Sequence, residues 1–326
     1  MKTLKKYWKM AACALLLAAG AAGAQEFPAR PVDLTVPFPP GGAADAPARF
    51  LGEGLTKVWK QPAVINNRAG AGGGIGAAFV KRAAADGHTL LITNPGLLSL
   101  PESERMFDRP PPYERSDFQP LALLVSDPTV IVVKADAPWK TFQDLVADAK
   151  KRPDAISYGS SGVYGASHLP IEMVAHAAGI KLRHIPYKGG GPAITAVLAG
   201  EVAATASVPA AMAPYIRSGA LRPLVQTGAR RHPSLPDVPT ATELGYSNAE
   251  FYLWIGVFAP AKTPEAVTRR IRADIAQAVQ QDPAFAQRMS TAGALVDYRD
   301  APAFNDFLDK DFARIKAAVQ RIGKVE

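Results

Sequence analysis

The sequence has only one cysteine, Cys13, and it lies inside an apolar run at positions 10–19. Four lysines precede this run and three small residues, Ala22-Gly23-Ala24, follow it, which is the pattern of a secretory signal peptide. We therefore expect residues 1–24 to be removed by cleavage near Ala24. Without Cys13 the chain can form no disulfide and has no thiol for catalysis, and an oxidising compartment is no hazard to it.

Long hydrophobic runs and a strong excess of one charge are also missing. The run before Ala24 is shorter than the roughly 20 residues that a membrane span needs, and no other stretch is long enough. The chain has 37 Lys and Arg against 29 Asp and Glu, but the expected signal peptide carries four of the lysines and no acid. The net charge therefore falls from +8 to +4, which gives little support to a nucleic-acid partner.

Nucleotide-binding fingerprints are absent, although the chain has 27 glycines. The glycine run at 70–76 does not fit G-x-G-x-x-G, and no glycine-rich stretch ends in Gly-Lys-Ser or Gly-Lys-Thr. We expect that this run instead lets a helix begin close to another segment of backbone, because glycine has no Cβ. Phosphate binding is the lesser alternative.

Short apolar strands alternate with helix-like segments along most of the chain, which predicts an α/β fold with largely parallel sheets. The strands are expected at 32–36, 63–65, 88–93, 130–133, 156–158, 183–185 and 202–206. The helices are expected at 48–59, 69–84, 141–150, 170–178 and 192–199. About 300 residues is more than one core usually holds, so we expect two lobes.

The C-terminal part is predicted to be helical. Thr263-Pro264-Glu265 supplies an N-cap, a proline at the first helical position and an acid in the first turn. An apolar stripe with a spacing of four residues follows, made of Val267, Ile271, Ile275 and Val279. The last helix carries apolar residues at helical spacing between Phe304 and Ile322. We interpret both stripes as core packing.

The stretch 34–50, LTVPFPPGGAADAPARF, is the first candidate ligand site. Its strand runs into prolines that make the exit rigid, and Gly41-Gly42 let the backbone turn tightly and approach a ligand. The helix that follows would direct unpaired N–H groups and the positive end of its dipole into this gap, which suits an anion. An ordinary strand-to-helix turn is an equal alternative on these residues alone.

This stretch resembles the first-loop signature of the Bug family, the periplasmic solute-binding proteins of tripartite tricarboxylate transporters. The signature consists of PFPPGG followed by Asp45 and Ala48-Arg49. Further matches follow in the family's order over nearly all of the chain after the signal peptide. They are NNRAGAGGGIGA at 66–77, ADGHTLL at 85–91, YGSSG…SHL at 158–169, HIPYKGGGPA at 184–193, SGALRPL at 218–224, SLPDVPT at 234–240 and GVFAPAKTP at 256–264.

The resemblance implies a two-lobed, type II-like periplasmic-binding-protein fold with a ligand cleft between the lobes. The chain would cross between the lobes twice, so that 26–126 plus 228–326 form lobe 1 and 127–227 form lobe 2. It also implies a receptor without enzymatic activity or cofactor, which captures a small carboxylate-containing ligand for a two-subunit membrane permease or a sensor protein. We expect this receptor to be a monomer in the periplasm.

The predicted ligand site consists of two loops that face each other, with flanking donors. Its residues are Phe38, Pro39, Gly41, Gly42 and Asp45 in the first loop, Ser160, Ser161, Gly162 and Ser167 in the second, and Thr93, Asn94 and Ser207 at the flanks. No Arg or Lys lies within 37–45 or 159–167, so an anion would be held by backbone N–H groups, helix ends and ordered water.

Several positions near the loops depart from the family's pattern or permit a second interpretation. Asp45 either caps the first helix or meets a donor group of the ligand. Ala44 stands where the family commonly has a hydroxyl residue, so one pocket donor would be missing. Pro47 disfavours helix at Ala46, so the helix is expected to begin late. The third pocket edge, AATASVPAA at 203–211, is less polar than in the family and leaves the ligand open.

A secreted serine hydrolase is the alternative from another class. Ser160 or Ser161 would be its nucleophile and His168 its base, but the G-x-S-x-G elbow is absent. We favour the interpretation that 159–165 is a second ligand loop before a helix.

A metal site is a further alternative on the helix after this loop. His168, Glu172 and His176 lie four apart and would share one helix face, but the H-E-x-x-H spacing is absent. We expect satisfied or solvated side chains here and no metal.

Overall fold

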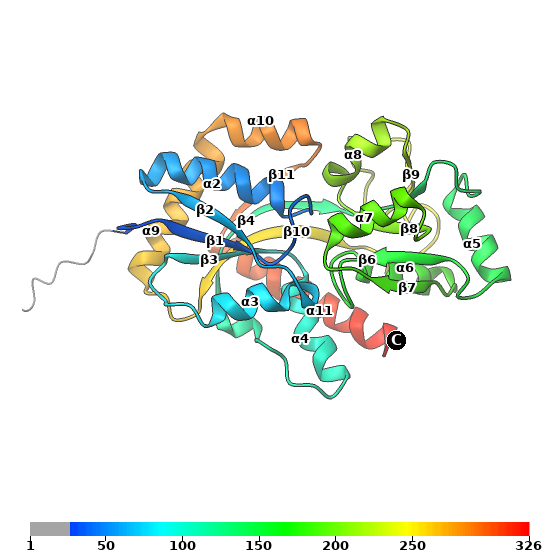
Figure 1. The fold of residues 1–326 in the computed structure, drawn as a ribbon, viewed down its shortest axis with the longest axis horizontal. Helices are drawn as coiled ribbons and strands as arrows, with labels where there is room; N and C mark the ends of the chain where they lie inside the picture. Colours follow the sequence, from blue (N-terminus) through cyan, green and yellow to red (C-terminus); the bar gives the residue numbers. More distant parts are fainter. Residues whose placement is uncertain (1–26, 326) are drawn as a thin grey trace, which may run out of the picture.

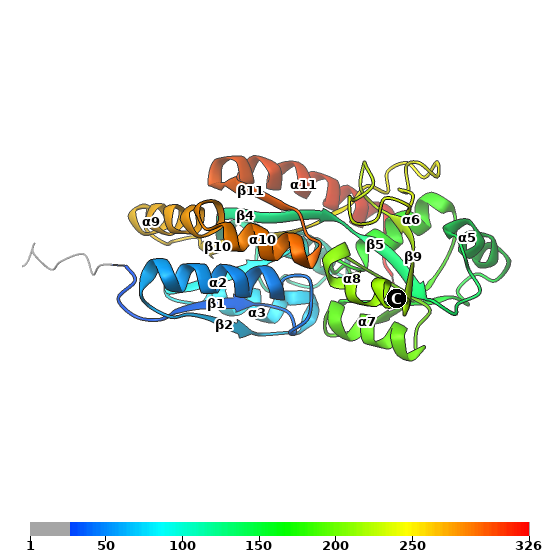
Figure 2. The same cartoon turned by 90° about the horizontal axis from the view of Figure 1, so that it is seen from above.

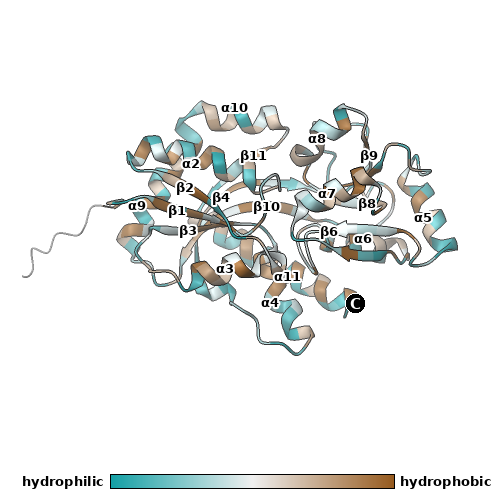
Figure 3. Ribbon diagram, in the orientation of Figure 1, coloured by the Kyte–Doolittle hydropathy of each residue, from teal (hydrophilic) through white to brown (hydrophobic). Residues whose placement is uncertain are grey.

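The computed structural model describes residues 27–325, so the predicted signal peptide and its cleavage near Ala24 lie outside the described residues. The described chain gathers around two sheets that lie next to each other along the long axis (Figure 1). Figure 3 shows hydrophobic residues concentrated on the strands, while outer helices such as α5 (Phe142–Lys151) carry hydrophilic residues as well. No described helix is long and apolar enough to span a membrane.

The first sheet has six strands in the order β11-β4-β10-β3-β1-β2. These strands are β1 (Val32–Val36), β2 (Ala63–Asn67), β3 (Thr89–Thr93), β4 (Phe118–Pro128), β10 (Tyr252–Pro260) and β11 (Val296–Asp300). The helices that belong with them are α2 (Asp45–Trp59), α3 (Gly74–Lys81), α4 (Gly96–Met106), α9 (Glu265–Ala276), α10 (Pro283–Ala292) and α11 (Ala301–Ile322).

The second sheet has five strands in the order β7-β6-β8-β5-β9. These strands are β5 (Val130–Lys134), β6 (Ser157–Ser160), β7 (Arg183–Pro186), β8 (Ala204–Ser207) and β9 (Leu221–Gln226). Besides α5, its helices are α6 (Leu169–Ala178), α7 (Gly190–Ala199) and α8 (Pro209–Arg217). The α/β class and the two-lobed fold are therefore confirmed.

The sheets are mixed, so the expectation of largely parallel sheets is wrong. Strand β1 pairs in parallel with β2 and β3, but β10 pairs antiparallel with β3 and β4, and β11 antiparallel with β4. In the second sheet β6 has parallel neighbours, whereas β5 runs antiparallel to β8 and β9. The antiparallel strands lie next to the crossings between sheets, because a strand that leaves one sheet and a strand that returns to it run in opposite directions.

Helix α2 begins at Asp45, three residues earlier than predicted. The expectation that Pro47 would delay the helix is wrong for a simple reason. Pro47 occupies the third position of the helix, where a backbone N–H has no intrahelical partner, so its missing N–H costs nothing there.

Helix α3 begins against the backbone of the first loop, as the glycine run predicted. A Cβ at Gly76 would lie 2.8 Å from the Cα of Pro37 and 2.9 Å from the carbonyl oxygen of Arg68. The predicted helix 69–84 is shorter than expected, because Ala71–Gly73 forms a separate 3-10 turn and α3 starts only at Gly74.

The two predicted C-terminal stripes are core packing. Ile271 and Ile275 are fully buried, and Phe304, Leu308 and Val319 of α11 are buried as well. Helix α9 begins at Glu265 without a side-chain cap, so the predicted capping role of Thr263 is wrong, and the buried Thr263 hydroxyl has no hydrogen-bond partner.

The two crossings between the sheets lie side by side. One runs from β4 to β5 through Thr129, and the other leaves β9 at Thr227. The Thr227 hydroxyl accepts the N–H of Thr129 at 3.0 Å and donates to the carbonyl of Phe251 at 2.7 Å, directly before β10. These bonds tie the outgoing and returning chain together at one point.

The segment between β9 and β10 packs on the second sheet. Thr240 forms a bridge with Gln226, and Val238 and Ala241 belong to the apolar clusters of that sheet. The sequence assigned 228–251 to lobe 1 together with the C-terminal residues. The predicted lobe boundaries stay a prediction, and this packing favours a second crossing near Phe251.

Helix α11 contacts the first sheet and a helix of the second lobe. Its body covers β4, while its last turns pack on α6 of the second sheet. The Tyr164 hydroxyl, from the loop before α6, donates to the carbonyl of Gly323. Figures 1 and 2 show this helix extending from the first sheet to beneath the second.

Candidate functional site

Loops from both sheets enclose a small polar pocket of about 20 Å³, which is room for one water-sized group. We call it the polar pocket. It brings together six of the predicted site residues and five others. The predicted ones are Phe38, Gly42, Asn94, Ser161, Ser167 and Ser207, and the others are Ala43, Ala44, Ala166, Gly190 and Leu253.

Ser161 and Ser167 hold the second loop in shape by a reciprocal pair of hydrogen bonds. The N–H of Ser161 donates to the Ser167 hydroxyl at 2.7 Å, and the N–H of Ser167 donates to the Ser161 hydroxyl at 3.4 Å. Each hydroxyl oxygen is thus an acceptor, and its own hydrogen is available to a ligand. The backbone N–H of Ser161, which the sequence predicted as a donor to the ligand, is instead bonded to the Ser167 hydroxyl within the loop.

Two predicted residues of this loop lie behind the pocket rather than on it. Ser160 is fully buried, and its hydroxyl lies 2.6 Å from Nε2 of His184. The N–H of Gly162 donates to the Ser160 hydroxyl at 3.1 Å, and a Cβ on Gly162 would lie 3.2 Å from the Cα of Gly72. Gly162 therefore makes a close contact between the two halves of the molecule and does not line the polar pocket.

The nucleophile and base of the hydrolase alternative are not paired. His168 accepts the N–H of Tyr164 through Nδ1 at 3.1 Å, and neither Ser160 nor Ser161 is its partner. His176 is exposed, and Glu172 accepts the Tyr158 hydroxyl, so the three residues weighed as metal ligands make separate contacts. No group of three His, Cys, Asp or Glu within 27–325 is placed to hold a metal.

The buried His168 lies beside the half-buried His184, and Glu172 in the helix that follows His168 is half-buried as well. The rings of His168 and His184 are 4.1 Å apart between centroids. Burial lowers the pKa of His184 to about 4. Burial also lowers the pKa of His168 well below its usual value, with the neighbouring His184 adding to the effect. Burial also raises the pKa of Glu172. Both histidines are therefore neutral at pH 7.

The His184 shift predicts that acid weakens the fold. Between pH 6.5 and 4 the unfolded chain binds a proton at this residue that the folded chain does not, so stability present above pH 6.5 is lost as the pH falls. We expect His184→Gln to reduce the loss of unfolding free energy between pH 7 and pH 4.5 by about 1 kcal/mol, allowing for partial exposure. Urea titrations at the two pH values measure it, and equal losses in both proteins would contradict it.

In the first loop, Asp45 is the first residue of α2 and not its N-cap. The N-cap is Ala44, without a side-chain bond. One oxygen of Asp45 accepts the N–H of Gly41 at 3.2 Å and Nε of Arg49 at 3.0 Å, while the other is buried and has no partner in the described chain. The capping interpretation is wrong, and a ligand contact of Asp45 stays a prediction.

Pro39 and Thr93, also predicted, line neither the polar pocket nor the cavity described below. Thr93 is buried at the end of β3. Pro39 packs on Gly189, where a Cβ would lie 2.4 Å from the Pro39 ring. This contact joins the first loop to the start of α7 in the second sheet.

The start of α7 is a part of the site that the sequence prediction missed. Gly190 is its first residue and lines the polar pocket, and a Cβ on Gly191 would lie 3.3 Å from the carbonyl oxygen of Pro40. The unpaired N–H groups of this helix end lie beside the first loop. The sequence prediction placed a ligand loop at Gly41-Gly42 because glycines there precede a helix. Gly189-Gly190-Gly191 precede α7 in the same way, so this pattern would also have predicted the start of α7 as part of the site.

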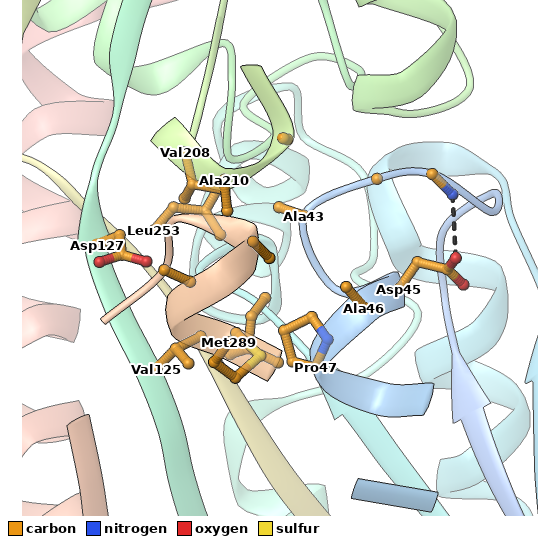
Figure 4. A pocket seen from close by; sticks show the side chains of 16 residues that line it. Ala43, Asp45, Ala46, Pro47, Val125, Asp127, Val208, Ala210, Leu253 and Met289 are labelled. Carbon is orange, nitrogen blue, oxygen red and sulfur yellow. Dashed lines mark hydrogen bonds between the residues drawn. The ribbon is translucent and has the colours of Figure 1, made fainter. Parts of the chain in front are cut away.

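A larger cavity of about 200 Å³ adjoins the polar pocket, and we call it the apolar cavity. The two share Gly42, Ala43 and Leu253. Its other lining residues are Gly41, Asp45, Ala46, Pro47, Val125, Asp127, Val208, Ala210, Ala211, Ile255, Met289, Ala292 and Ala294 (Figure 4). They come from both sheets, and none carries a basic side chain.

Two mixed sheets joined by a double crossing, with pockets lined from both, define the two-lobed class of periplasmic binding proteins. The chain belongs to the tripartite tricarboxylate transporter receptor family, since the model "Tripartite tricarboxylate transporter family receptor" matches residues 47–324. The resemblance to the Bug family is thereby confirmed.

Individual relatives agree with this assignment. The "UPF0065 protein in tcbD-tcbE intergenic region" of Pseudomonas sp. (strain P51) is 38% identical over 78% of this chain and 75% of its own length. The structure of the periplasmic binding protein BugD has a TM-score of 0.84 at 33% identity, covering 91% of this chain and 99% of that one. R. palustris Rpa4515 with adipate has a TM-score of 0.85 at 29% identity, with the same coverage of 91% and 99%.

Proposed function

We propose that this chain is a periplasmic receptor that binds a small carboxylate-containing solute in the polar pocket and presents it to a two-subunit membrane permease. The observation that carries the proposal is the convergence of hydroxyl, amide and helix-end donors from both sheets on one pocket. Asn94, Ser161, Ser167 and Ser207 supply side-chain donors, and Gly190 begins a helix there. The related Rpa4515 structure with adipate supports a carboxylate as the solute class.

A carboxylate fits this pocket although no lysine or arginine lines it. Arg49, in the first turns of α2, is bonded to Asp45. Helix N-termini carry partial positive charge and unpaired N–H groups, so they bind anions without a cationic side chain. A site of this kind releases its solute more readily than a buried ion pair, which suits a receptor that must unload.

The chain acts as a receptor and not as an enzyme in this proposal. Its family is a receptor family, and the predicted base His168 is bonded to neither serine. Ser160, whose hydroxyl lies 2.6 Å from Nε2 of His184, is fully buried behind the polar pocket. The same proposal includes three further points. The receptor delivers its solute to a permease rather than to a sensor, it is a monomer, and its signal peptide is cleaved near Ala24. The lobes would close about the crossings at Thr129 and Thr227, with the segment up to Phe251 moving with the second sheet.

Calorimetry with small carboxylates and their neutral amides tests the solute class. We expect at least one carboxylate to bind with a micromolar Kd and its amide to bind at least 100-fold more weakly, because the pocket's donors favour negative charge. Ser161→Ala is expected to weaken binding by about 1–3 kcal/mol, since Ser161 lines the pocket and its hydroxyl can donate to the solute.

Ser290→Ala, on the exposed surface of α10, is the matched control and should leave the affinity unchanged. Equal affinity for the amides would contradict the proposal. Turnover of generic esters that is lost in Ser161→Ala would favour the hydrolase instead.

A further inference from the structure

The polar pocket and the apolar cavity differ tenfold in size. The polar pocket has about 20 Å³, whereas the apolar cavity has about 200 Å³. The two adjoin at Gly42, Ala43 and Leu253. A solute with its carboxylate in the polar pocket has room there for little else, so the rest of it must extend into the apolar cavity.

The walls of the apolar cavity favour hydrocarbon. All lining residues except Asp45 and Asp127 are apolar or glycine. Figure 4 shows Pro47, Val208, Leu253 and Met289 around the same space. An engineered apolar cavity of about 150 Å³ takes up benzene, so this one has room for a phenyl ring or a short alkyl chain.

The two acids of the wall disfavour a second carboxylate. One Asp45 oxygen accepts the N–H of Gly41 (Figure 4). Carboxylate oxygens are acceptors, so Asp45 supplies no donor for a second carboxylate. Asp127 is 1% exposed, accepts the N–H of Leu295 at 3.3 Å and lies 3.4 Å from Nε2 of His232. A second carboxylate in this space would face hydrocarbon and an acid, with no basic side chain among the lining residues to pair with it.

We propose that the solute is an amphipathic monocarboxylate, with its carboxylate in the polar pocket and an aliphatic or aromatic body in the apolar cavity. This inference rests on the proposed function, because it takes the polar pocket to be the carboxylate site. The proposed solute differs from adipate, which carries a charged carboxylate at each end. It also explains the apolar edge at 203–211, of which Val208, Ala210 and Ala211 line the cavity.

Three six-carbon probes test the inference by calorimetry. Hexanoate, adipate and 6-aminohexanoate share one carboxylate and differ only at the far end, which is methyl, carboxylate or ammonium. We expect hexanoate to bind at least 30-fold tighter than the other two, and benzoate to bind as well.

Adipate binding as tightly as hexanoate would overturn the inference and leave a carboxylate receptor standing. Tighter binding of 6-aminohexanoate would overturn it too, with Asp127 as the partner of the ammonium group. Failure of both hexanoate and benzoate to bind at 10 mM would also overturn it. Hexanamide binding as tightly as hexanoate would instead contradict the proposed function.

Two variants at half-buried cavity positions sharpen the test. Ala292→Phe, near the end of α10, should fill the cavity and weaken hexanoate at least tenfold. Ser290→Phe, exposed on the same helix, is the control and should leave hexanoate binding and the unfolding midpoint unchanged. Ala210→Lys, on α8, should raise the affinity for adipate at least tenfold while lowering that for hexanoate. Unchanged affinities in both cavity variants would place the body of the solute elsewhere.

Discussion

Gly42→Val is expected to reduce the affinity for the bound carboxylate at least 100-fold, which is about 2.7 kcal/mol. Gly42 lines both the polar pocket and the apolar cavity, so a branched side chain there takes up space that the solute needs. The fold should tolerate the change. Gly42 does not have a positive φ, and its added Cβ would meet only the carbonyl oxygen of Pro39, at an ordinary 3.5 Å. Calorimetry gives the affinity, and thermal unfolding shows that the protein is intact.

Gly200→Asn is the control for this variant. Gly200 follows α7 and lines neither the polar pocket nor the apolar cavity; it has a φ of +79°, which asparagine tolerates better than other side chains, and no atom lies within 4 Å of an added Cβ. We expect its affinity to stay within about threefold of the wild type. Normal affinity in Gly42→Val, or an equal loss in Gly200→Asn, would show that the solute does not lie against Gly42.

Gly76→Val should have the largest effect on stability. The Cβ would lie 2.7 Å from the Cβ and 2.8 Å from the Cα of Pro37, and 2.9 Å from the carbonyl oxygen of Arg68. Two of these atoms are backbone, which cannot swing aside, so α3 must move away from the first loop. We expect a loss of about 3 kcal/mol or more in unfolding free energy, measured by urea unfolding.

Gly76→Ala gives a graded measurement if the valine variant does not fold. It keeps the same Cβ collisions but omits the branch, and a loss of about 1–3 kcal/mol is expected. Gly42→Val serves as the control for valine itself, since it places the same side chain in the neighbouring loop without such a collision. Losses below about 1 kcal/mol in both Gly76 variants would contradict the close packing of α3 on Pro37.

Local sequence signals predicted the elements whose pattern is complete within a few residues. Strand β1 lies at the predicted residues because the apolar Val32, Leu34 and Val36 alternate with polar residues and a proline follows them. Strands β4 and β10 were missed, although β4 contributes the entire run from Leu121 to Val125 to the core. Burial on both faces removes the alternation of polar and apolar residues, and the prolines in the run resembled a boundary.

Six residues of the polar pocket were predicted from the sequence because they lie in short loops or at strand ends, and their role in binding stays a prediction. The apolar cavity depends on side chains from β4, β10, α8 and α10, which the fold brings together from positions as distant as Val125 and Met289. No short sequence motif can predict a cavity that is lined by residues so far apart in the chain. Ser160 lies in the same motif as Ser161, but its hydroxyl is turned inward to His184, and the sequence does not distinguish the two orientations.

In the proposed function, the contacts of α11 with both lobes would affect how an empty receptor competes for a permease. Tyr164 and the last turns of α11 connect the two lobes through contacts that involve no residue lining the polar pocket or the apolar cavity. The arrangement of the lobes described above is therefore partly maintained in the absence of cargo. A permease that recognises only this shape would also dock unloaded receptors, so uptake would slow when receptor greatly outnumbers solute.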